Sequence, residues 1–257
     1  MYYFKYMIIG LFALFLFNGC GGPDRSDSLI VIDAGHGGHD CGALCAGKRE
    51  KDLVLEITRR LAKEFKRKGY RVYMTRGKDT FLKLGERTRI ADKMDAKVFI
   101  SIHANAIADR ARFNLVEGIE TYYLQKTRDA RSQRVAAREN ASVLKGADTL
   151  SKNVIIDSVL NGPKIVESNK LALDVQHSTI KQVRYRYRDV RDGGAKPAPF
   201  YVLVGASRPS ILVEVGYITN TKERKRLFSS DYQRRIVKGI VEGVGRYLDN
   251  RKAEIGV

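Results

Sequence analysis

Apolar residues recur at the spacing of an α-helix in two segments of the chain. In residues 51–70 they stand four apart, and the stripe ends at Gly69; residues 230–251 repeat the pattern. The two stripes are Leu53, Ile57, Leu61 and Phe65, and Ile236, Ile240, Val244 and Leu248. Because residues four apart share one face of a helix, both segments are predicted to be amphipathic helices.

Short apolar runs alternate with helical patterns along the rest of the chain. The runs are LIVID (29–33), RVYMTR (71–76), AKVFISI (96–102), EGIETYYL (117–124), PFYVLVG (199–205) and SILVEVG (210–216). A further helical pattern lies at 84–95. Strands that alternate with helices favour a mostly parallel sheet covered on both faces. We therefore predict an α/β fold: a single domain with a twisted, mostly parallel central sheet of about six strands.

Residues 126–183 are mostly polar and helical in pattern. A stretch of roughly fifty residues without an obvious strand is long for a crossover between strands. We predict that it contains a functional helical insertion as well as helices that pack on the sheet.

The first 20 residues have the pattern of an export signal. Lys5 precedes an apolar block at 7–17, which is too short to span a bilayer comfortably, and small residues follow it. Cys20 resembles the acylated cysteine of a bacterial lipoprotein, although Phe17 stands where that signal usually has Leu. We predict a signal at 1–20, a tether at 21–28, and export to the periplasm. There the protein is a lipoprotein anchored through Cys20; a cleaved ordinary signal or an uncleaved anchor is the alternative.

The chain is strongly basic, with 47 Lys and Arg against 29 Asp and Glu and a net charge of +18. Such an excess favours a polyanionic partner. Export argues against nucleic acid and for a cell-envelope polymer or an anionic membrane face. Arginines and tyrosines alternate at 183–188, which predicts a strand with the arginines on one face, either as an anion-binding surface or as a solvated edge.

Beyond Cys20 the chain has two cysteines, Cys41 and Cys45. In an oxidising compartment they form a local disulfide or stay as two free thiols. A soft metal site would need more ligands than this pair.

Four residues could carry chemistry at one edge of the predicted sheet. His36 follows the first strand, His103 follows the run at 96–102, Glu214 lies within SILVEVG, and Glu50 precedes the first helix. The carboxyl ends of parallel strands meet at one edge, so these residues would converge there. Considered one at a time, each of three residues has a simpler interpretation: His36 could be a turn residue, His103 could be a buried core residue, and Glu50 could be a surface charge. Glu214 is different, because an ionised carboxylate in an apolar strand needs a partner.

Two imidazoles and one carboxylate are the usual ligands of a catalytic zinc ion that keeps a position open for water. A second carboxylate would then take the proton from that water and pass it to the leaving nitrogen. Glu214 is the candidate for this second role.

Together these motifs resemble a known family. The chain resembles the zinc-dependent N-acetylmuramoyl-L-alanine amidases of the bacterial cell wall. The resemblance is carried, in this order, by VIDAGHGGHDCGA, Glu50, RTRIADKMDAKVFISIHAN and RPSILVEVGYITN. The resemblance implies that one zinc ion is held by His36, Glu50 and His103 and that Glu214 is the catalytic carboxylate. Asp33 would orient a ligand, whereas His39 stands outside the family pattern.

The resemblance also implies an activity and a mode of control. The family cleaves the amide between the lactyl group of N-acetylmuramic acid and L-alanine of the stem peptide, for wall remodelling or daughter-cell separation. The amidase domain would span 29–257, with a regulatory insertion at about 143–163 that covers the site until an activator protein displaces it. In autoinhibited members a Glu of that helix binds zinc, but here only Asp148 and Asp157 carry carboxylates.

Two other classes of function, and one other kind of enzyme, remain open from the sequence. A non-catalytic peptidoglycan-binding protein of the envelope would keep the fold without the reaction, although the four intact residues argue against it. A zinc peptidase of similar fold would cut a different bond. A polyanion-binding protein driven by charge alone would bind nucleic acid tightly and lack zinc.

Overall fold

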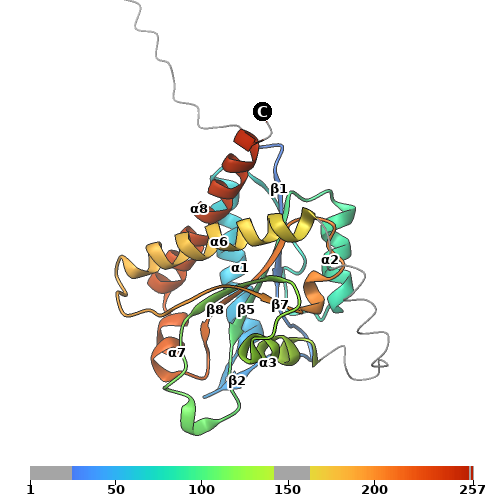
Figure 1. The fold of residues 1–257 in the computed structure, drawn as a ribbon. Coiled ribbons are helices and arrows are strands. Elements are labelled where there is room, and N and C mark those ends of the chain that lie inside the picture. The colour runs from blue at the N-terminus through green and yellow to red at the C-terminus, as the bar shows by residue number, and fades with distance from the viewer. Residues whose placement is uncertain (1–24, 142–162, 255, 257) are drawn as a thin grey trace, which may run out of the picture.

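A computed structural model describes residues 25–141, 163–254 and 256, which form a central sheet surrounded by helices (Figure 1). The strands of this sheet are β1 (Leu29–Ala34), β4 (Arg71–Met74), β5 (Val98–Asn105), β6 (Ile119–Leu124), β7 (Asp192–Ala198) and β8 (Ser210–Tyr217). A separate hairpin contains β2 (Leu44–Cys45) and β3 (Lys48–Arg49). The α-helices are α1 (Glu50–Arg67), α2 (Leu84–Lys93), α3 (Ala130–Glu139), α6 (Pro163–Arg184), α7 (Thr221–Leu227) and α8 (Ser230–Glu254). Two short 3₁₀ turns are η1 (Arg110–Arg112) and η2 (Tyr201–Leu203).

The sheet is mixed, with the order β4-β1-β5-β8-β6-β7. All neighbouring strands are parallel except β6 and β8, which are antiparallel. Every residue of the central strands β1, β5 and β8 is buried, as expected for strands with helices on both faces. The predicted α/β class and six-stranded, mostly parallel sheet are therefore confirmed.

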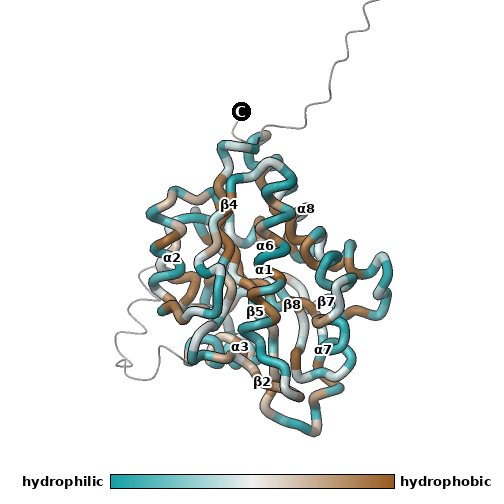
Figure 2. Tube along the Cα trace, turned by 180° about the vertical axis from the view of Figure 1, so that it is seen from behind, coloured by the Kyte–Doolittle hydropathy of each residue, from teal (hydrophilic) through white to brown (hydrophobic). Residues whose placement is uncertain are grey.

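Two apolar clusters fill the space on the two faces of the sheet. One contains residues of α1, α6 and α8, and the other contains residues of α2, α3 and η2. Figure 2 shows hydrophobic residues concentrated along the strands and the inner helix faces, with hydrophilic residues outside. The carboxyl ends of β1 and β5 point toward α3 and β2 at the lower end of Figure 1.

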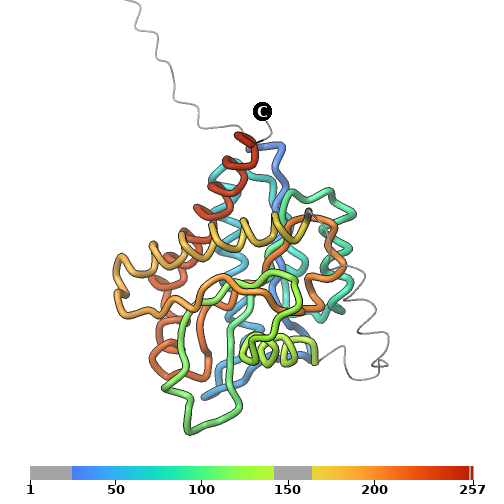
Figure 3. The backbone as a smooth tube through the Cα atoms, in the orientation of Figure 1, coloured from blue at the N-terminus to red at the C-terminus, as the bar shows by residue number. Residues whose placement is uncertain are grey.

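Helices α6 and α8 cross at very short range (Figure 3). A methyl group placed on Gly239 would lie 2.4 Å from the Cα of Thr179, and one on Gly243 would lie 2.5 Å from the Cα of Val175. These glycines stand four apart in α8, so they share one helix face. The two backbones approach this closely because neither glycine has a side chain.

We expect Gly239→Ala to destabilise the protein by about 1–3 kcal/mol, because the added methyl group must push α6 and α8 apart. Urea denaturation measures the change. Gly85→Ala in α2 is the matched control: a methyl group there meets no atom within 4 Å, so no loss is expected. Equal stability of Gly239→Ala and wild type would contradict the close approach of the helices.

The strand predicted at 199–205 is wrong. Tyr201–Leu203 form η2, and the strand is the preceding β7. The apolar run is explained by burial: Phe200 and Val202 pack in the cluster on the α2 side of the sheet. Pro197 is tolerated in β7 because this edge strand pairs only with β6.

The strand predicted at 183–188 is also wrong. Helix α6 continues to Arg184 and a turn follows. The ring of Tyr187 packs edge-on against Tyr232, with 5.0 Å between centroids, and its hydroxyl donates a hydrogen bond to Asp231 at 3.0 Å. The basic residues therefore stand at the end of a helix, where its dipole favours positive charge.

Several predictions fall on residues outside the described part of the chain. These are the signal at 1–20 with Cys20, and the insertion at 143–163 except for its last residue. Arg25, the first described residue, forms an ion pair with Asp249 of α8 at 3.0 Å. Among the described helices, none is both long enough and apolar enough to cross a membrane.

Cys41 and Cys45 lie in the segment before α1 as free thiols. The Sγ of Cys45 lies 3.3 Å from the guanidinium of Arg224, which also donates to the backbone oxygens of Ile218 and Thr219. Of the two alternatives, the structure has the free thiols.

Candidate metal centre and catalytic site

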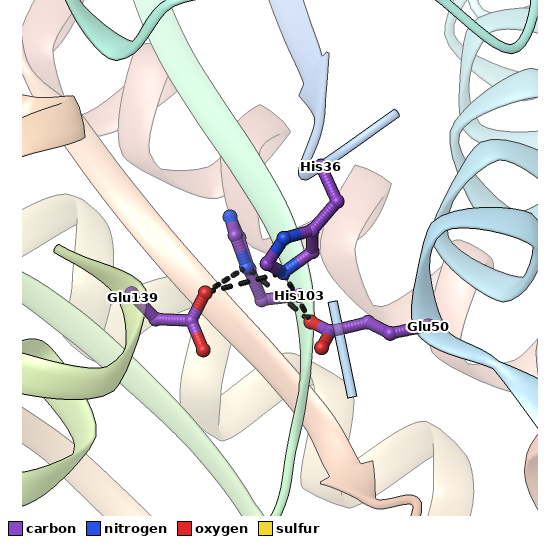
Figure 4. A group of neighbouring side chains, drawn as sticks. All are labelled: His36, Glu50, His103 and Glu139. Atoms are coloured by element: carbon purple, nitrogen blue, oxygen red, sulfur yellow. Dashed lines mark ion pairs between the residues drawn. The ribbon is translucent and has the colours of Figure 1, made fainter. Parts of the chain in front are cut away.

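Two histidines and two glutamates converge beside the carboxyl ends of β1 and β5 (Figure 4). His36 follows β1, His103 lies in β5, Glu50 is the first residue of α1, and Glu139 is the last residue of α3. One ligand atom from each residue lies within 4.8 Å of all the others. The two carboxylates approach the imidazoles from opposite sides (Figure 4). The group could therefore hold a metal ion.

The distances between these atoms match those of a tetrahedral metal site. His36 Nε2 lies 3.1 Å from Glu50 Oε1 and 3.2 Å from Glu139 Oε2. His103 Nδ1 lies 3.4 Å and 2.9 Å from the same two oxygens. Zinc bonds of about 2.0–2.1 Å in tetrahedral geometry separate the ligand atoms by about 3.3 Å.

The same atoms are poorly placed to bond one another. His36 Nε2, both ring nitrogens of His103 and Glu139 Oε2 are buried and have no hydrogen-bond partner among the described residues. Buried polar atoms normally have partners, and a cation at the centre of the group would supply one. The donor set of nitrogen and carboxylate oxygen suits zinc.

The charges of the group also fit a cation. Burial opposes protonation of the imidazoles, but the carboxylates outweigh it: Glu50 raises the pKa of His36 well above its usual value, and Glu139 raises that of His103 to about 9. Burial favours the neutral acids, yet the imidazoles hold the pKa of Glu50 below its usual range, and Arg138 together with the imidazoles does the same for Glu139. The site therefore favours positive charge at its centre.

The buried side chain of Arg87 holds the turn that carries His36. Arg87 donates to the backbone oxygens of Ala34 and His36 and forms an ion pair with Asp33 at 2.8 Å. His36 itself has a left-handed backbone, with φ at +58°, which is uncommon for a residue with a side chain. Asp33 does not hydrogen-bond to either histidine, so it supports the turn through Arg87 and not by the direct contact that the sequence suggested.

Glu50 is oriented by two backbone amides. Ala43 N–H donates to Oε2 and Ala104 N–H donates to Oε1, both at 2.9 Å. Gly42 packs directly against this carboxylate: a methyl group there would lie 2.6 Å from the His36 ring and 2.7 Å from Glu50 Oε2. Gly35 is packed in the same way against the ring of His103. The glycines of the VIDAGHGGHDCGA motif therefore make room for the site residues.

Asp40 holds the second nitrogen of His36. Its Oδ2 lies 3.0 Å from His36 Nδ1, and its Oδ1 accepts the N–H of Gly42 at 3.0 Å. Burial favours the neutral acid, but the contact with His36 lowers the pKa of Asp40 overall. A carboxylate in this position fixes the ring orientation and leaves Nε2 free to bind a metal.

We expect Asp40→Asn to weaken metal binding by roughly 10–100-fold, because the neutral amide orients His36 less well and makes the ring a weaker ligand. Competition with a chelator measures the metal affinity. Asp52→Asn is the control: this exposed carboxylate pairs with Arg49 and should leave the affinity unchanged. Unchanged affinity in Asp40→Asn would remove the orienting role.

Glu214 lies next to the four-residue group and is fully buried. Neither of its oxygens has a hydrogen-bond partner among the described residues, and Arg138 Nη2 lies 3.7 Å from Oε1. Burial and the charge of Glu139 raise the pKa of Glu214 well above its usual value, although Arg138 opposes them. A carboxylate in this setting is poised to take up a proton.

Glu120 pairs with Glu214 across β6 and β8 and is also fully buried. Its carboxylate is surrounded by partners at 2.9–3.1 Å, namely Lys196, Arg131, Asn105, Tyr122 and Tyr217. Two buried carboxylates on paired strands therefore differ in role: Glu120 is neutralised by its neighbours, whereas Glu214 is left available.

A cavity of about 520 Å³ opens onto the metal-binding group, between His36 and Glu50 on one side and Glu139 on the other. His39 lies in its wall with its ring 4.1 Å from that of Phe81. His39 is not one of the four residues of the metal-binding group.

The structure thus brings together all four residues that the sequence singled out and adds Glu139 to them. His103 lies within β5, not beyond it, and Glu50 begins α1, not the segment before it. Glu139 was missed because a capping glutamate was expected within 143–163, which begins four residues later. Glu120, like Glu214, is a carboxylate in an apolar strand, and that pattern was the available signal for it.

The fold and site define a class: a hydrolase of the cell-wall amidase type, with an α/β fold and a buried His and Glu group that could bind a metal. Residues 30–246 match the family model described as N-acetylmuramoyl-L-alanine amidase, and the chain belongs to this family. The family resemblance found in the motifs is therefore confirmed.

Individual relatives agree with this assignment. The chain is 34% identical over 239 residues to N-acetylmuramoyl-L-alanine amidase AmiC of Escherichia coli O6:H1, across 90% of this chain and 55% of AmiC, so it spans about half the length of that relative. A crystal structure of an N-acetylmuramoyl-L-alanine amidase from Clostridium difficile 630 superposes with a TM-score of 0.66 and 30% identity, covering 87% of this chain and 98% of that one. The CwlD amidase from Clostridioides difficile, solved in complex with the GerS lipoprotein, gives a TM-score of 0.64 at 25% identity, over 87% of this chain and 100% of that one.

Proposed function

We propose that the protein is a zinc-dependent N-acetylmuramoyl-L-alanine amidase. It would hydrolyse the amide between the lactyl group of N-acetylmuramic acid and L-alanine of the stem peptide. The observation that carries the proposal is the buried group of His36, Glu50 and His103 with the unpartnered Glu214 beside it, in a chain of this family.

His36, Glu50 and His103 would hold the zinc ion. When bound, zinc supplies a Lewis acid that polarises the substrate carbonyl and lowers the pKa of water. The chain contributes a fixed geometry: backbone amides and Asp40 orient the ligands before the metal arrives.

Glu214 would move the proton. Its carboxylate takes a proton from the attacking water while the water oxygen bonds to the lactyl carbonyl carbon. The protonated carboxyl then gives that proton to the amide nitrogen as the carbon–nitrogen bond breaks. The stem peptide leaves with a free amine, the lactyl group keeps the new carboxyl group with the second proton of the water, and Glu214 returns to its starting form. A raised pKa supports this cycle, because the group can hold the proton between the two steps.

In this structure Glu139 would block the site. Its Oε2 lies beside both imidazoles and would serve as a fourth ligand, which would exclude the substrate carbonyl and water from that position. Helix α3 is held there by Asn140, which bonds Pro199 and Tyr201 at 2.8 Å. We propose that an activator protein displaces α3 together with the insertion that follows it. The structural neighbour solved with a lipoprotein partner supports control by a partner.

The remaining parts of the proposal concern location. We propose that residues 1–20 direct export, that Cys20 carries a lipid anchor in the periplasm, and that the protein acts in wall remodelling or daughter-cell separation. The supporting observation is the apolar block followed by a cysteine among small residues. The net charge of +18 suits an anionic envelope partner.

The test is incubation of the metal-loaded protein with purified peptidoglycan, with and without Glu139→Ala, and identification of the products by mass. Released stem peptides that begin with L-alanine support the amidase. Cleavage within the stem peptide would identify a zinc peptidase instead. Binding to peptidoglycan without release by either protein would indicate a non-catalytic wall-binding protein.

A further inference from the structure

A second cavity, of about 440 Å³, lies beside the catalytic residues between the segment around η1 and helix α3. Four arginines line it: Arg112, Arg131, Arg134 and Arg138. Asp109 also lines it, and its Oδ1 accepts the N–H of Ala111 within the same turn. More cationic than anionic side chains therefore line the cavity.

We propose that this cavity binds a short acidic peptide, the chemistry of the stem peptide that the amidase would release, and that the bound peptide holds Glu139 in the metal site. The inference rests on the proposed function for the source of the peptide. It makes the enzyme subject to inhibition by its own product.

The cavity continues directly from the catalytic residues. Asn105 and Tyr217 line it, and they follow His103 and Glu214 on the same two strands. Arg138 joins the two regions. Its Nη1 donates to the backbone oxygen of Ala106 at 2.7 Å, its Nε and Nη2 donate to Glu139 Oε1, and Nη2 lies 3.7 Å from Glu214 Oε1. A stem peptide released beside Glu214 would therefore reach this cavity directly.

The arginines of this cavity differ in whether they already have a hydrogen-bond or ion-pair partner. Arg131 is fixed by Glu120 at 2.9 Å and by the hydroxyl of Tyr217 at 2.8 Å. Arg112 and Arg134 are exposed, and within the described ranges their guanidinium groups have no hydrogen bond or ion pair. The planar guanidinium group suits bidentate pairing with a carboxylate. Ile107, Val116 and Val135 add apolar walls, which suit the methyl and methylene groups of a short peptide.

The two unpaired arginines come from different elements. Arg112 lies in η1, whereas Arg134 lies in α3, the helix that ends at Glu139. A ligand that bridges them binds only while α3 stays in the position described here. By linkage, such a ligand stabilises that position and so keeps Glu139 between the histidines.

The experiment is calorimetric titration of the metal-loaded full chain with L-Ala-D-Glu, using L-Ala-D-Gln as the peptide without the side-chain carboxylate. We expect Arg112→Gln and Arg134→Gln each to weaken binding of the acidic peptide by roughly tenfold, the usual size for loss of one charged hydrogen bond. Arg110→Gln removes an exposed charge from η1 outside the cavity and should leave binding unchanged. Equal effects of all three substitutions, equal binding of both peptides, or no binding to wild type would each overturn the proposal.

Hydrogen exchange gives a second readout that a general charge effect would not move. The acidic peptide should slow exchange of the amides at 130–139 in wild type but not in Arg134→Gln. Binding without slower exchange in α3 would overturn the coupling to Glu139. Both measurements are made without turnover, so failure of the amidase assay leaves them interpretable, and hydrolysis with failed binding rejects only this cavity.

Discussion

Glu214→Gln is expected to lower the rate of stem-peptide release by about 10²–10⁴-fold, since the amide cannot accept a proton from water or return one to the leaving nitrogen. Metal content should not change, because the ligand-type atoms belong to other residues. Product release is followed by mass, and bound metal is measured on the same sample. Retention of most of the activity would remove Glu214 from the mechanism.

The same substitution should make the metal-free fold more stable. Burial raises the pKa of Glu214 in the folded protein, so ionisation above the unfolded-state pKa destabilises the fold, and the penalty grows as pH rises toward the folded-state pKa. A neutral glutamine removes this penalty. Thermal unfolding of metal-free protein near pH 8 should therefore show a higher Tm for Glu214→Gln than for wild type.

Glu120→Gln is the matched control for this prediction. It changes an equally buried glutamate on the paired strand, but the Glu120 carboxylate is neutralised by Lys196 and Arg131. Loss of that charge leaves the partly buried cations Lys196 and Arg131 without their partner, which should lower stability. Opposite effects on Tm would distinguish the available carboxylate from the structural one; effects of the same sign would contradict that distinction.

The sequence predicted the part of the site that depends on strand ends. His36 and His103 come from parallel neighbours, and the registry of β1 with β5 brings their ends together regardless of distant contacts. Glu214 could be selected because its strand is apolar and its charge needs a partner. The motif spacing then added Glu50 through the family resemblance.

Glu139 could not be found in the same way. It stands in a polar helix among several arginines, and nothing in that local pattern separates it from a solvated charge. Its place in the site is set by contacts between distant segments, such as Asn140 with Pro199 and Arg131 with Glu120. Tertiary contacts of this kind cannot be predicted from the periodicity of apolar residues.

The error at 199–205 has a related cause. An apolar run indicates burial, but burial is equally compatible with a strand or with a short helical turn. The residues of η2 are buried against the α2 side of the sheet, while the polar, glycine-containing β7 forms the edge strand. An edge strand packs against fewer neighbouring side chains, so its sequence has a weaker apolar pattern.

Glu139→Ala is expected to activate the protein. The substitution removes the carboxylate that stands in the fourth ligand position but keeps His36, Glu50 and His103, so that water and substrate can enter. If the closed position is favoured by about 2 kcal/mol, its loss raises activity by roughly 30-fold. Alanine is preferred to glutamine because an amide oxygen could still reach the metal. The rate of release of stem peptides from peptidoglycan measures the effect.

Two further variants separate removal of the ligand from release of the helix. Asn140→Ala breaks the contacts with Pro199 and Tyr201 and leaves Glu139 intact, so it should activate by a smaller factor. Ala137→Ser changes an exposed residue of α3 that lines neither cavity and should leave the basal rate unchanged. Loss of both metal and activity in Glu139→Ala would instead show that all four residues form a closed structural metal site, because structural zinc sites use four protein ligands whereas catalytic ones keep a position open.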